Sequence, residues 1–385
     1  MPLKLTERAV IVFYSLSPFL YLGRTLIGDF GYMAILLRSL EPLVVIIFFI
    51  QLLKSAVLSP PKIWWILLSI GLYGVLAGLV QGNIASNIAS GFLHYLAGLL
   101  IFIYYYHNPI MDKADQFFKL LSICVLSSIT IVVILIYVAP YFFGTSIYIG
   151  LATQILIVVF AYSVHKKNFL IAILTFTLIL ASGKRGVIVA LLGGSFLVLP
   201  LIINKYGARL LKIMTFCFAI SAVIVSLSSS LTEKISSKLE FDTSKSLNYY
   251  SAGRITELES SFNMWRNQSL STFTGLGFGF SYDYISTDSE IEVIEGHRNV
   301  HFSYINPVIS FGVVSIIYYF CFLLFLFRVF NAGDRLFVFK WSIVSYLLYS
   351  CFVFNLYNEP ILWLLIGSLV SRKKISDIGC THERK

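Results

Sequence analysis

The chain has 385 residues, of which 58% are hydrophobic and only 12% are charged, and its formal net charge is +10. A soluble globular domain carries about a quarter charged residues, so this composition excludes an ordinary soluble protein. It indicates an integral membrane protein, because each helical crossing of a bilayer needs about 20 mainly apolar residues.

Apolar runs along the chain predict about twelve transmembrane helices. In chain order they are Ala9–Leu22, Tyr32–Leu53, Ile63–Val80, Gly91–Tyr106, Leu120–Val138, Ile147–Val164, Phe169–Ala181, Gly186–Ile203, Leu210–Leu227, Phe302–Phe327, Leu336–Phe354 and Ile361–Val370. Helices satisfy their own backbone hydrogen bonds in lipid. We therefore expect an all-α integral membrane protein in which residues 1–385 form a single polytopic domain.

Lysine and arginine residues are concentrated in alternate loops between these segments. With the N-terminus in the cytoplasm, each inward-facing loop holds two or more of them, whereas the short outward loops hold only Arg24, Lys184 and Arg185. This distribution follows the positive-inside rule. It predicts that both termini are cytoplasmic, and it explains the positive net charge without a nucleic-acid partner.

A long polar loop, Leu231–Val300, is predicted on the outward side between the ninth and tenth segments, and it holds more than half of the acidic residues. Apolar residues recur there at the spacing of an amphipathic surface helix. They are Ile255, Leu258, Phe262 and Trp265. The run Gly275-Leu-Gly-Phe-Gly279 predicts a tight loop that returns to the membrane, and the acidic stretch Asp283–Glu295 is expected to face solvent.

The sequence carries no pattern that requires a metal or another cofactor. HExxH, CxxC, P-loop and GxSxG motifs are all missing from the sequence. The sequence therefore gives no support for a zinc-dependent protease, a nucleotide hydrolase or a serine hydrolase. The side chains of Glu290, Glu292 and Glu295 could hold a divalent cation, but an acidic loop is usually only solvated. We expect neither a metal nor a cofactor.

Cationic side chains occupy three places near the predicted outer surface. Lys184 and Arg185 lie in a short turn, and Arg254 opens the amphipathic helix. His301, with Arg298 nearby, lies where the chain re-enters the membrane. Each has an ordinary explanation, since basic side chains snorkel to lipid headgroups and a histidine can simply be hydrogen-bonded at an interface. Together they suit a phosphate or a diphosphate, whose oxygens arginine binds two at a time.

The order of these features resembles the O-antigen polymerase and O-antigen ligase superfamily of bacterial membrane glycosyltransferases, which have a GT-C-type fold. The similar motifs are Ser182-Gly-Lys-Arg-Gly186, Gly253-Arg254 followed by Trp265, Gly275-Leu-Gly-Phe-Gly279, and His301-Phe-Ser-Tyr followed by Gly312 and Val313. They lie between Ala181 and Phe320. Phe302 stands where the family commonly has Asn, so His301 and His297 both stay candidates for the functional histidine.

The resemblance implies polymerisation of oligosaccharide repeat units carried on undecaprenyl diphosphate, at the periplasmic face of the bacterial inner membrane. It implies that the catalytic residues are His301, Arg254 and Arg185, and that the substrate-binding residues are Lys184, Arg298, His297, Gly275 and Gly277. A diphosphate leaving group needs cations, and the attacking sugar hydroxyl needs a base such as histidine. The implied partners are membrane lipid, a chain-length regulator protein and a flippase.

Two other functions stay open at this point. An O-antigen ligase, which transfers finished polymer to the lipid A core, has nearly the same sequence features. A polysaccharide-lipid transporter or flippase belongs to a different class, and it is disfavoured because charges within the apolar segments are sparse, Arg38 and Glu41 being the main pair.

Overall fold

The computed structural model describes residues 3–27, 46–52, 54, 60–143, 154–182, 184–200, 215–216, 219, 254–267, 271–286, 292–297, 300–331, 337–351 and 359–371. Most of the predicted segments Leu210–Leu227 and Tyr32–Leu53 lies outside these residues, as do Arg38 and Glu41. The other predicted segments lie mainly on helices. Phe169–Ala181 is reproduced with the same bounds by α7.

Among the described residues, four helical stretches are long and apolar enough to cross a membrane. They are α3 (Lys62–Val80), α4 (Ala85–His107), the stretch from the 3-10 turn η1 (Met111–Lys113) into α5 (Ala114–Phe143), and the broken helix of α15 (Asn306–Phe311), η2 (Gly312–Val314) and α16 (Ser315–Asn331). Together with α1 (Leu5–Ile27), they pack with shorter apolar helices. These are α6 (Ile155–His165), α7 (Phe169–Ala181), α8 (Arg185–Leu197), α17 (Phe337–Tyr349) and α18 (Pro360–Val370).

The centre of the bundle is formed by α18, every residue of which is buried. Small residues let it approach α4 closely. A Cβ atom added at Gly98 of α4 would lie 2.5 Å from Nε1 of Trp363, and one added at Gly367 would lie 2.6 Å from the carbonyl oxygen of Phe102. Close approach of this kind is the usual basis of helix association in lipid, where apolar burial alone provides no driving force between helices.

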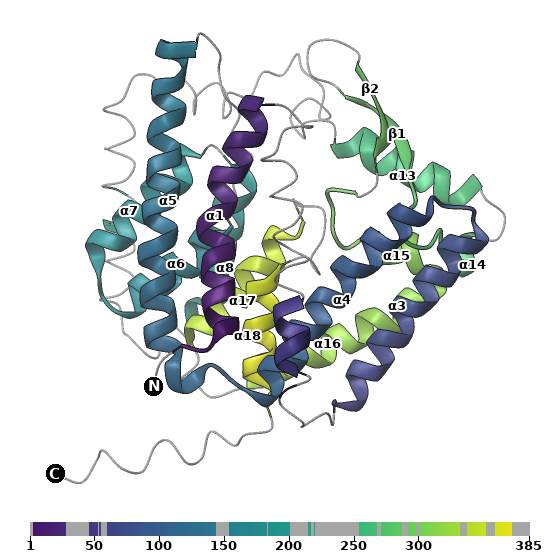
Figure 1. Ribbon diagram of the computed structural model, residues 1–385, viewed down its shortest axis with the longest axis horizontal. Helices are drawn as coiled ribbons and strands as arrows, with labels where there is room; N and C mark the ends of the chain where they lie inside the picture. The colour runs from purple at the N-terminus through teal and green to yellow at the C-terminus, as the bar shows by residue number, and fades with distance from the viewer. Residues whose placement is uncertain are drawn as a thin grey trace.

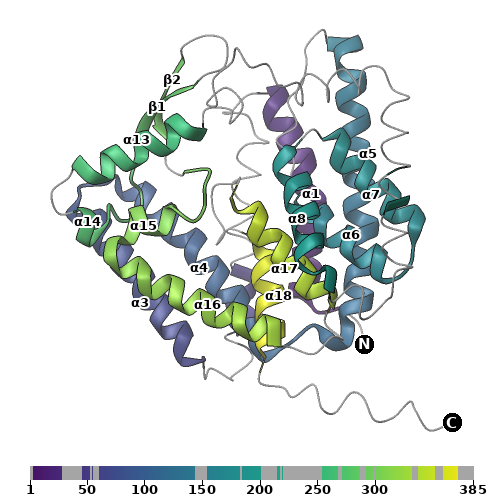
Figure 2. The ribbon, with the colours of Figure 1, turned by 180° about the vertical axis from the view of Figure 1, so that it is seen from behind.

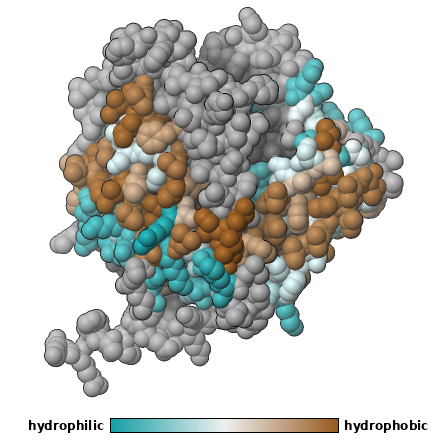
Figure 3. Space-filling view, viewed as in Figure 1, coloured by the Kyte–Doolittle hydropathy of each residue, from teal (hydrophilic) through white to brown (hydrophobic). Residues whose placement is uncertain are grey.

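The outer faces of α3, α5 and α16 carry large apolar side chains. Leu76, Ile134 and Phe327 are among those that are exposed. In Figure 3 the visible face of the molecule carries broad hydrophobic areas, with hydrophilic residues gathered below them and at the upper right. A bilayer is the environment in which such a surface is stable.

The ends of the helices fall on two opposite sides of the molecule (Figures 1 and 2). On one side, which we call the terminal end, Lys4 Nζ donates to Oδ1 of Asn108 just after α4, and the N–H of Ile110 donates to Ser368 Oγ near the end of α18. Lys166 pairs with Asp115 at 2.5 Å on the same side, joining α6 to the start of α5. These basic residues belong to alternate predicted loops, as the positive-inside pattern requires.

The opposite side, which we call the loop end, carries α13 (Arg254–Asn267), α14 (Ser271–Thr274) and the strands β1 (Tyr282–Ser286) and β2 (Glu292–His297). The strands form a two-stranded antiparallel sheet with Tyr284 opposite Ile294. The all-α prediction missed this hairpin within the acidic stretch. Its signal was local alternation, since Tyr282 and Tyr284 are buried whereas Asp283 between them is exposed.

The glycine run after α14 fastens the loop end to α3 and α4. Gly277 has a φ of +70°, and a Cβ atom there would lie 1.9 Å from the backbone nitrogen of Gly78. The N–H of Phe278 donates to the carbonyl of Gly74 in α3, and Asn83 Nδ2 donates to the carbonyls of Leu276 and Phe278. The run is therefore a tight loop against the helices, as predicted.

Candidate active site at the loop end

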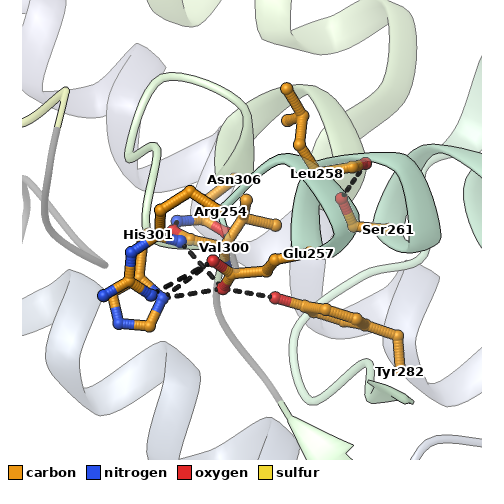
Figure 4. A network of polar contacts seen from close by, with 8 residues as sticks. All are labelled: Arg254, Glu257, Leu258, Ser261, Tyr282, Val300, His301 and Asn306. Atoms are coloured by element: carbon orange, nitrogen blue, oxygen red, sulfur yellow. Dashed lines mark hydrogen bonds and ion pairs between the residues drawn. The ribbon is translucent and has the colours of Figure 1, made fainter. Parts of the chain in front are cut away.

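A buried carboxylate, that of Glu257, joins α13, β1 and the loop that precedes α15 (Figure 4). His301 Nδ1 lies 2.8 Å from Oε1 and 2.9 Å from Oε2, and the backbone N–H of His301 donates to Oε1 at 3.1 Å. The hydroxyl of Tyr282 donates to Oε1 at 2.9 Å, and Arg254 Nη1 lies 3.3 Å from Oε2. Neither oxygen of this carboxylate is left without a donor.

Helix α13 places Glu257 inward because its apolar residues pack on the loop end's own core. Leu258, Met264 and Trp265 contact a cluster that includes Phe280, Tyr282 and Ile309. Ser261, one turn after Glu257 on the same face, is also fully buried. Arg254 opens the helix three residues before Glu257, the spacing at which helical side chains are neighbours.

The position of His301 is set by Asn306, which begins α15. The N–H of Val300 donates to Asn306 Oδ1 and Asn306 Nδ2 donates to the carbonyl of Val300, each at 2.9 Å. Asn306 is fully buried. The N–H of Ser303 donates to the carbonyl of Ser350 at the end of α17, so this loop is tied to both the loop end and the helix bundle.

The electrostatics favour an ionised Glu257 beside a histidine. Burial raises the pKa of Glu257. The opposing effects are larger, and they come from the hydrogen bond and charge of His301, the charge of Arg254 and the hydrogen bond from Tyr282. The pKa of Glu257 therefore lies below its usual value. The pKa of Tyr282 is raised by burial and by the nearby carboxylate, which keeps the phenol neutral and able to donate.

This arrangement gives the two ring nitrogens of His301 different roles. Because an ionised Glu257 can only accept, Nδ1 keeps its proton and donates a hydrogen bond to the carboxylate, which fixes the tautomer and the ring orientation. Nε2 then has the lone pair that accepts a proton, and it points away from the carboxylate (Figure 4). Buried carboxylates that orient a histidine in this way also stabilise the imidazolium that forms when it acts as a base.

The structure thus brings together Arg254 and His301, two of the three residues predicted to be catalytic, through a residue that the sequence analysis missed. The available signal for Glu257 was its spacing of three residues from Arg254. His297 lies at the end of β2 opposite Tyr282, but its side chain and the whole of Arg298 lie outside the described residues.

The other predicted residues lie in two separate places. Lys184 precedes α8 and Arg185 is its first residue, with the side chain of Arg185 outside the described part. Its convergence with Arg254 stays a prediction. Gly275 and Gly277, predicted to bind substrate, are buried, and an added Cβ at Gly275 would lie 2.4 Å from the carbonyl oxygen of Ser310. Backbone packing accounts for the glycine at both positions.

Long apolar helices around a buried core define a multi-pass membrane protein. Residues 170–320, which include Lys184, Arg254, Glu257 and His301, match the model of a family described as O-antigen ligase. Over these residues the chain is similar to the O-antigen ligase and polymerase superfamily, whose members are membrane glycosyltransferase-like enzymes. No curated protein and no solved structure shows significant similarity to it.

Proposed function

We propose that this protein polymerises oligosaccharide repeat units carried on undecaprenyl diphosphate into O-antigen or a related surface polysaccharide. The observation that carries the proposal is the contact of His301 with Glu257, 2.8 Å apart, within the part of the chain that matches the family. It supplies a base of fixed tautomer beside a cation, which is what transfer of a sugar from a diphosphate requires.

In the proposed reaction, a hydroxyl oxygen of the acceptor repeat attacks the anomeric carbon of the donor repeat. The bond from that carbon to the diphosphate oxygen breaks, and undecaprenyl diphosphate leaves with the electron pair. The hydroxyl proton passes to Nε2 of His301. Glu257 stabilises the resulting imidazolium through its contact with Nδ1, and Tyr282 holds the carboxylate in place.

Arg254 is proposed to bind the diphosphate. Its side chain is 40% exposed although it contacts the buried Glu257, so its guanidinium reaches both the carboxylate and the surface of the loop end. Arginine stays charged at all relevant pH values and binds two phosphate oxygens in parallel. Arg185 is proposed to add a second guanidinium, and Lys184 an ammonium, from the turn before α8.

The loop end would then face the periplasm, with both termini in the cytoplasm of a bacterium. The support is the location of Lys4, Lys113 and Lys166 at the terminal end, opposite α13 and the hairpin. Lipid-linked repeats present their diphosphate at the membrane surface, so the substrate's tail would lie among the apolar helices. A flippase that delivers repeats and a chain-length regulator stay proposed partners.

Ligation is the second candidate, because the matched family is described as O-antigen ligase. The same residues would serve, with a sugar of the lipid A core as the acceptor. A deletion strain separates the two functions. Loss of a polymerase leaves core carrying one repeat, whereas loss of a ligase leaves core without any repeat.

The direct test is purified protein with a defined lipid-linked repeat, assayed for longer lipid-linked chains with and without a chelator. We expect products that carry two or more repeats, released undecaprenyl diphosphate, and no loss of activity on chelation. His301→Ala should abolish the products. Glu259→Gln is the matched control, because Glu259 lies on the same helix but is exposed. No elongation by the wild-type protein would refute polymerisation.

A further inference from the structure

An exposed aromatic side chain, that of Phe302, directly follows the proposed base. Phe302 is 37% exposed, whereas the side chain of His301 before it is only 13% exposed and Ser303 after it is buried. The Cα atoms of neighbouring residues are about 3.8 Å apart. A sugar whose hydroxyl reaches His301 therefore lies within range of the Phe302 ring.

The backbone that carries this ring is fixed on both sides. The N–H of Ile305 donates to the carbonyl of Phe302 at 2.9 Å and closes a turn. The N–H of Ser303 donates to the carbonyl of Ser350, at the end of α17, at 3.0 Å. Phe302 therefore keeps its place relative to the helix bundle, as a residue that binds a ligand in one orientation must.

The ring itself is supported by Tyr304. The two ring centroids lie 5.6 Å apart and the ring planes cross at 62°, which is close to the edge-to-face arrangement that aromatic pairs prefer. Tyr304 is in turn held by two hydrogen bonds. Its hydroxyl donates to the carbonyl of Leu347 at 2.7 Å, and its own carbonyl accepts from the hydroxyl of Tyr319. This contact orients the Phe302 ring and still leaves part of the ring exposed.

A ring in this place is suited to a sugar. The face of an aromatic ring is electron-rich, so it attracts the weakly positive C–H groups that one face of a pyranose presents. Residues Asn306–Arg328 are long and apolar enough to cross a membrane, so Phe302 lies just before the chain enters the bilayer. The saccharide part of a lipid-linked substrate lies outside the apolar core of the membrane, at the same level.

We propose that Phe302 is a specificity-determining residue that stacks on the pyranose ring of the acceptor sugar, the sugar whose hydroxyl is deprotonated by His301. This proposal rests on the proposed function and extends it to the substrate. The preferred acceptor is a pyranose with a face of C–H groups next to the attacking hydroxyl. Phe302 takes up no proton and does not bind the diphosphate. It holds the sugar so that the hydroxyl points to Nε2 of His301.

The test uses purified protein and two partial ligands, the lipid-free oligosaccharide of the repeat and undecaprenyl diphosphate without a sugar. Each is measured as an inhibitor of elongation, together with kcat and KM for the lipid-linked repeat. Phe302→Leu keeps an apolar side chain but removes the flat ring. It should raise KM and weaken inhibition by the oligosaccharide about three- to tenfold, the contribution of one aromatic contact. Inhibition by undecaprenyl diphosphate should not change.

Three further variants separate stacking from a structural effect. Phe302→Tyr keeps the ring and should retain the KM of the wild type. Phe302→Trp also keeps a ring, and its fluorescence relative to the wild type should change when the oligosaccharide is added but not when undecaprenyl diphosphate is added. Phe273→Leu is the matched control, because Phe273 in α14 is an exposed phenylalanine of the loop end, and it should leave all constants unchanged.

Two results would overturn the proposal. One is a Phe302→Leu protein with unchanged KM and unchanged inhibition by the oligosaccharide. The other is an equal loss of inhibition by undecaprenyl diphosphate, which would place the lipid part of the substrate against the ring. Failure of the proposed function would look different, because the wild-type protein itself would then not elongate the repeat.

Discussion

His301 and Glu257 are joined twice, once through the backbone N–H of His301 and once through its Nδ1, at 3.1 and 2.8 Å from the same carboxylate oxygen. The first contact fixes where the residue lies and the second fixes which way its ring faces. The carboxylate on α13 therefore fixes the tautomer of the proposed base and, together with Asn306, its location.

Glu257→Gln should lower kcat for elongation by on the order of 100-fold, the lower range of what general base catalysis contributes. An amide cannot stabilise the imidazolium, and its NH₂ group can turn toward Nδ1 and favour the wrong tautomer. The measurement is the initial rate of chain elongation with purified protein. The exposed neighbour Glu259 provides the control, because Glu259→Gln should retain full activity; equal rates for both variants would contradict a role for Glu257.

The stability that Glu257 contributes should depend on pH in a defined direction. Its pKa in the folded protein lies below the ordinary value of 4.5. Its favourable contribution is therefore complete above pH 4.5 and is lost as the pH falls through the lower value of the folded state. Thermal unfolding of wild type and Glu257→Gln, compared at pH 7 and at about pH 3.5, should show a smaller difference in acid. A difference that grows in acid would contradict the assignment.

Gly277→Ala should separate the loop end from α3. The added Cβ would overlap the backbone nitrogen of Gly78 at 1.9 Å, and alanine is also strained at a φ of +70°. We expect a loss of more than about 3 kcal/mol in the free energy of unfolding, seen as a lower unfolding temperature and faster proteolysis. Gly296→Ala is the matched control: its φ is +65° but nothing lies within 4 Å, so only the strain of about 1 kcal/mol remains.

Asn306→Ala should impair activity through the placement of His301. The change removes both hydrogen bonds to Val300 and leaves a buried N–H and a buried carbonyl without these bonds, at a cost of about 1–3 kcal/mol each. Asn263→Ala, an exposed asparagine of α13, should have little effect. Elongation rates and thermal unfolding of both variants check this. A destabilised but fully active Asn306→Ala protein would show that the loop does not position the base.

The sequence by itself determined the helical membrane class, the segments that became α7 and α18, and the separation of basic residues to one end. These properties follow from composition and periodicity, because a bilayer accepts only segments that are apolar and internally hydrogen-bonded. The motif order also pointed to Arg254 and His301. The hairpin was missed because its alternation of buried tyrosine and exposed aspartate is short and lies in an acidic stretch.

Only the tertiary structure decided that Glu257 is the partner of His301. The two residues come from different parts of the chain, and Glu257 looked like an ordinary surface charge along the sequence. In the folded protein the residue is buried, and a carboxylate removed from water is costly unless hydrogen-bond donors and cations compensate its charge. Which residues supply them depends on the elements that the fold places next to the carboxylate. Similarly, the sequence predicted that Gly275 and Gly277 bind substrate, whereas the structure shows that Gly277 packs against the backbone of Gly78.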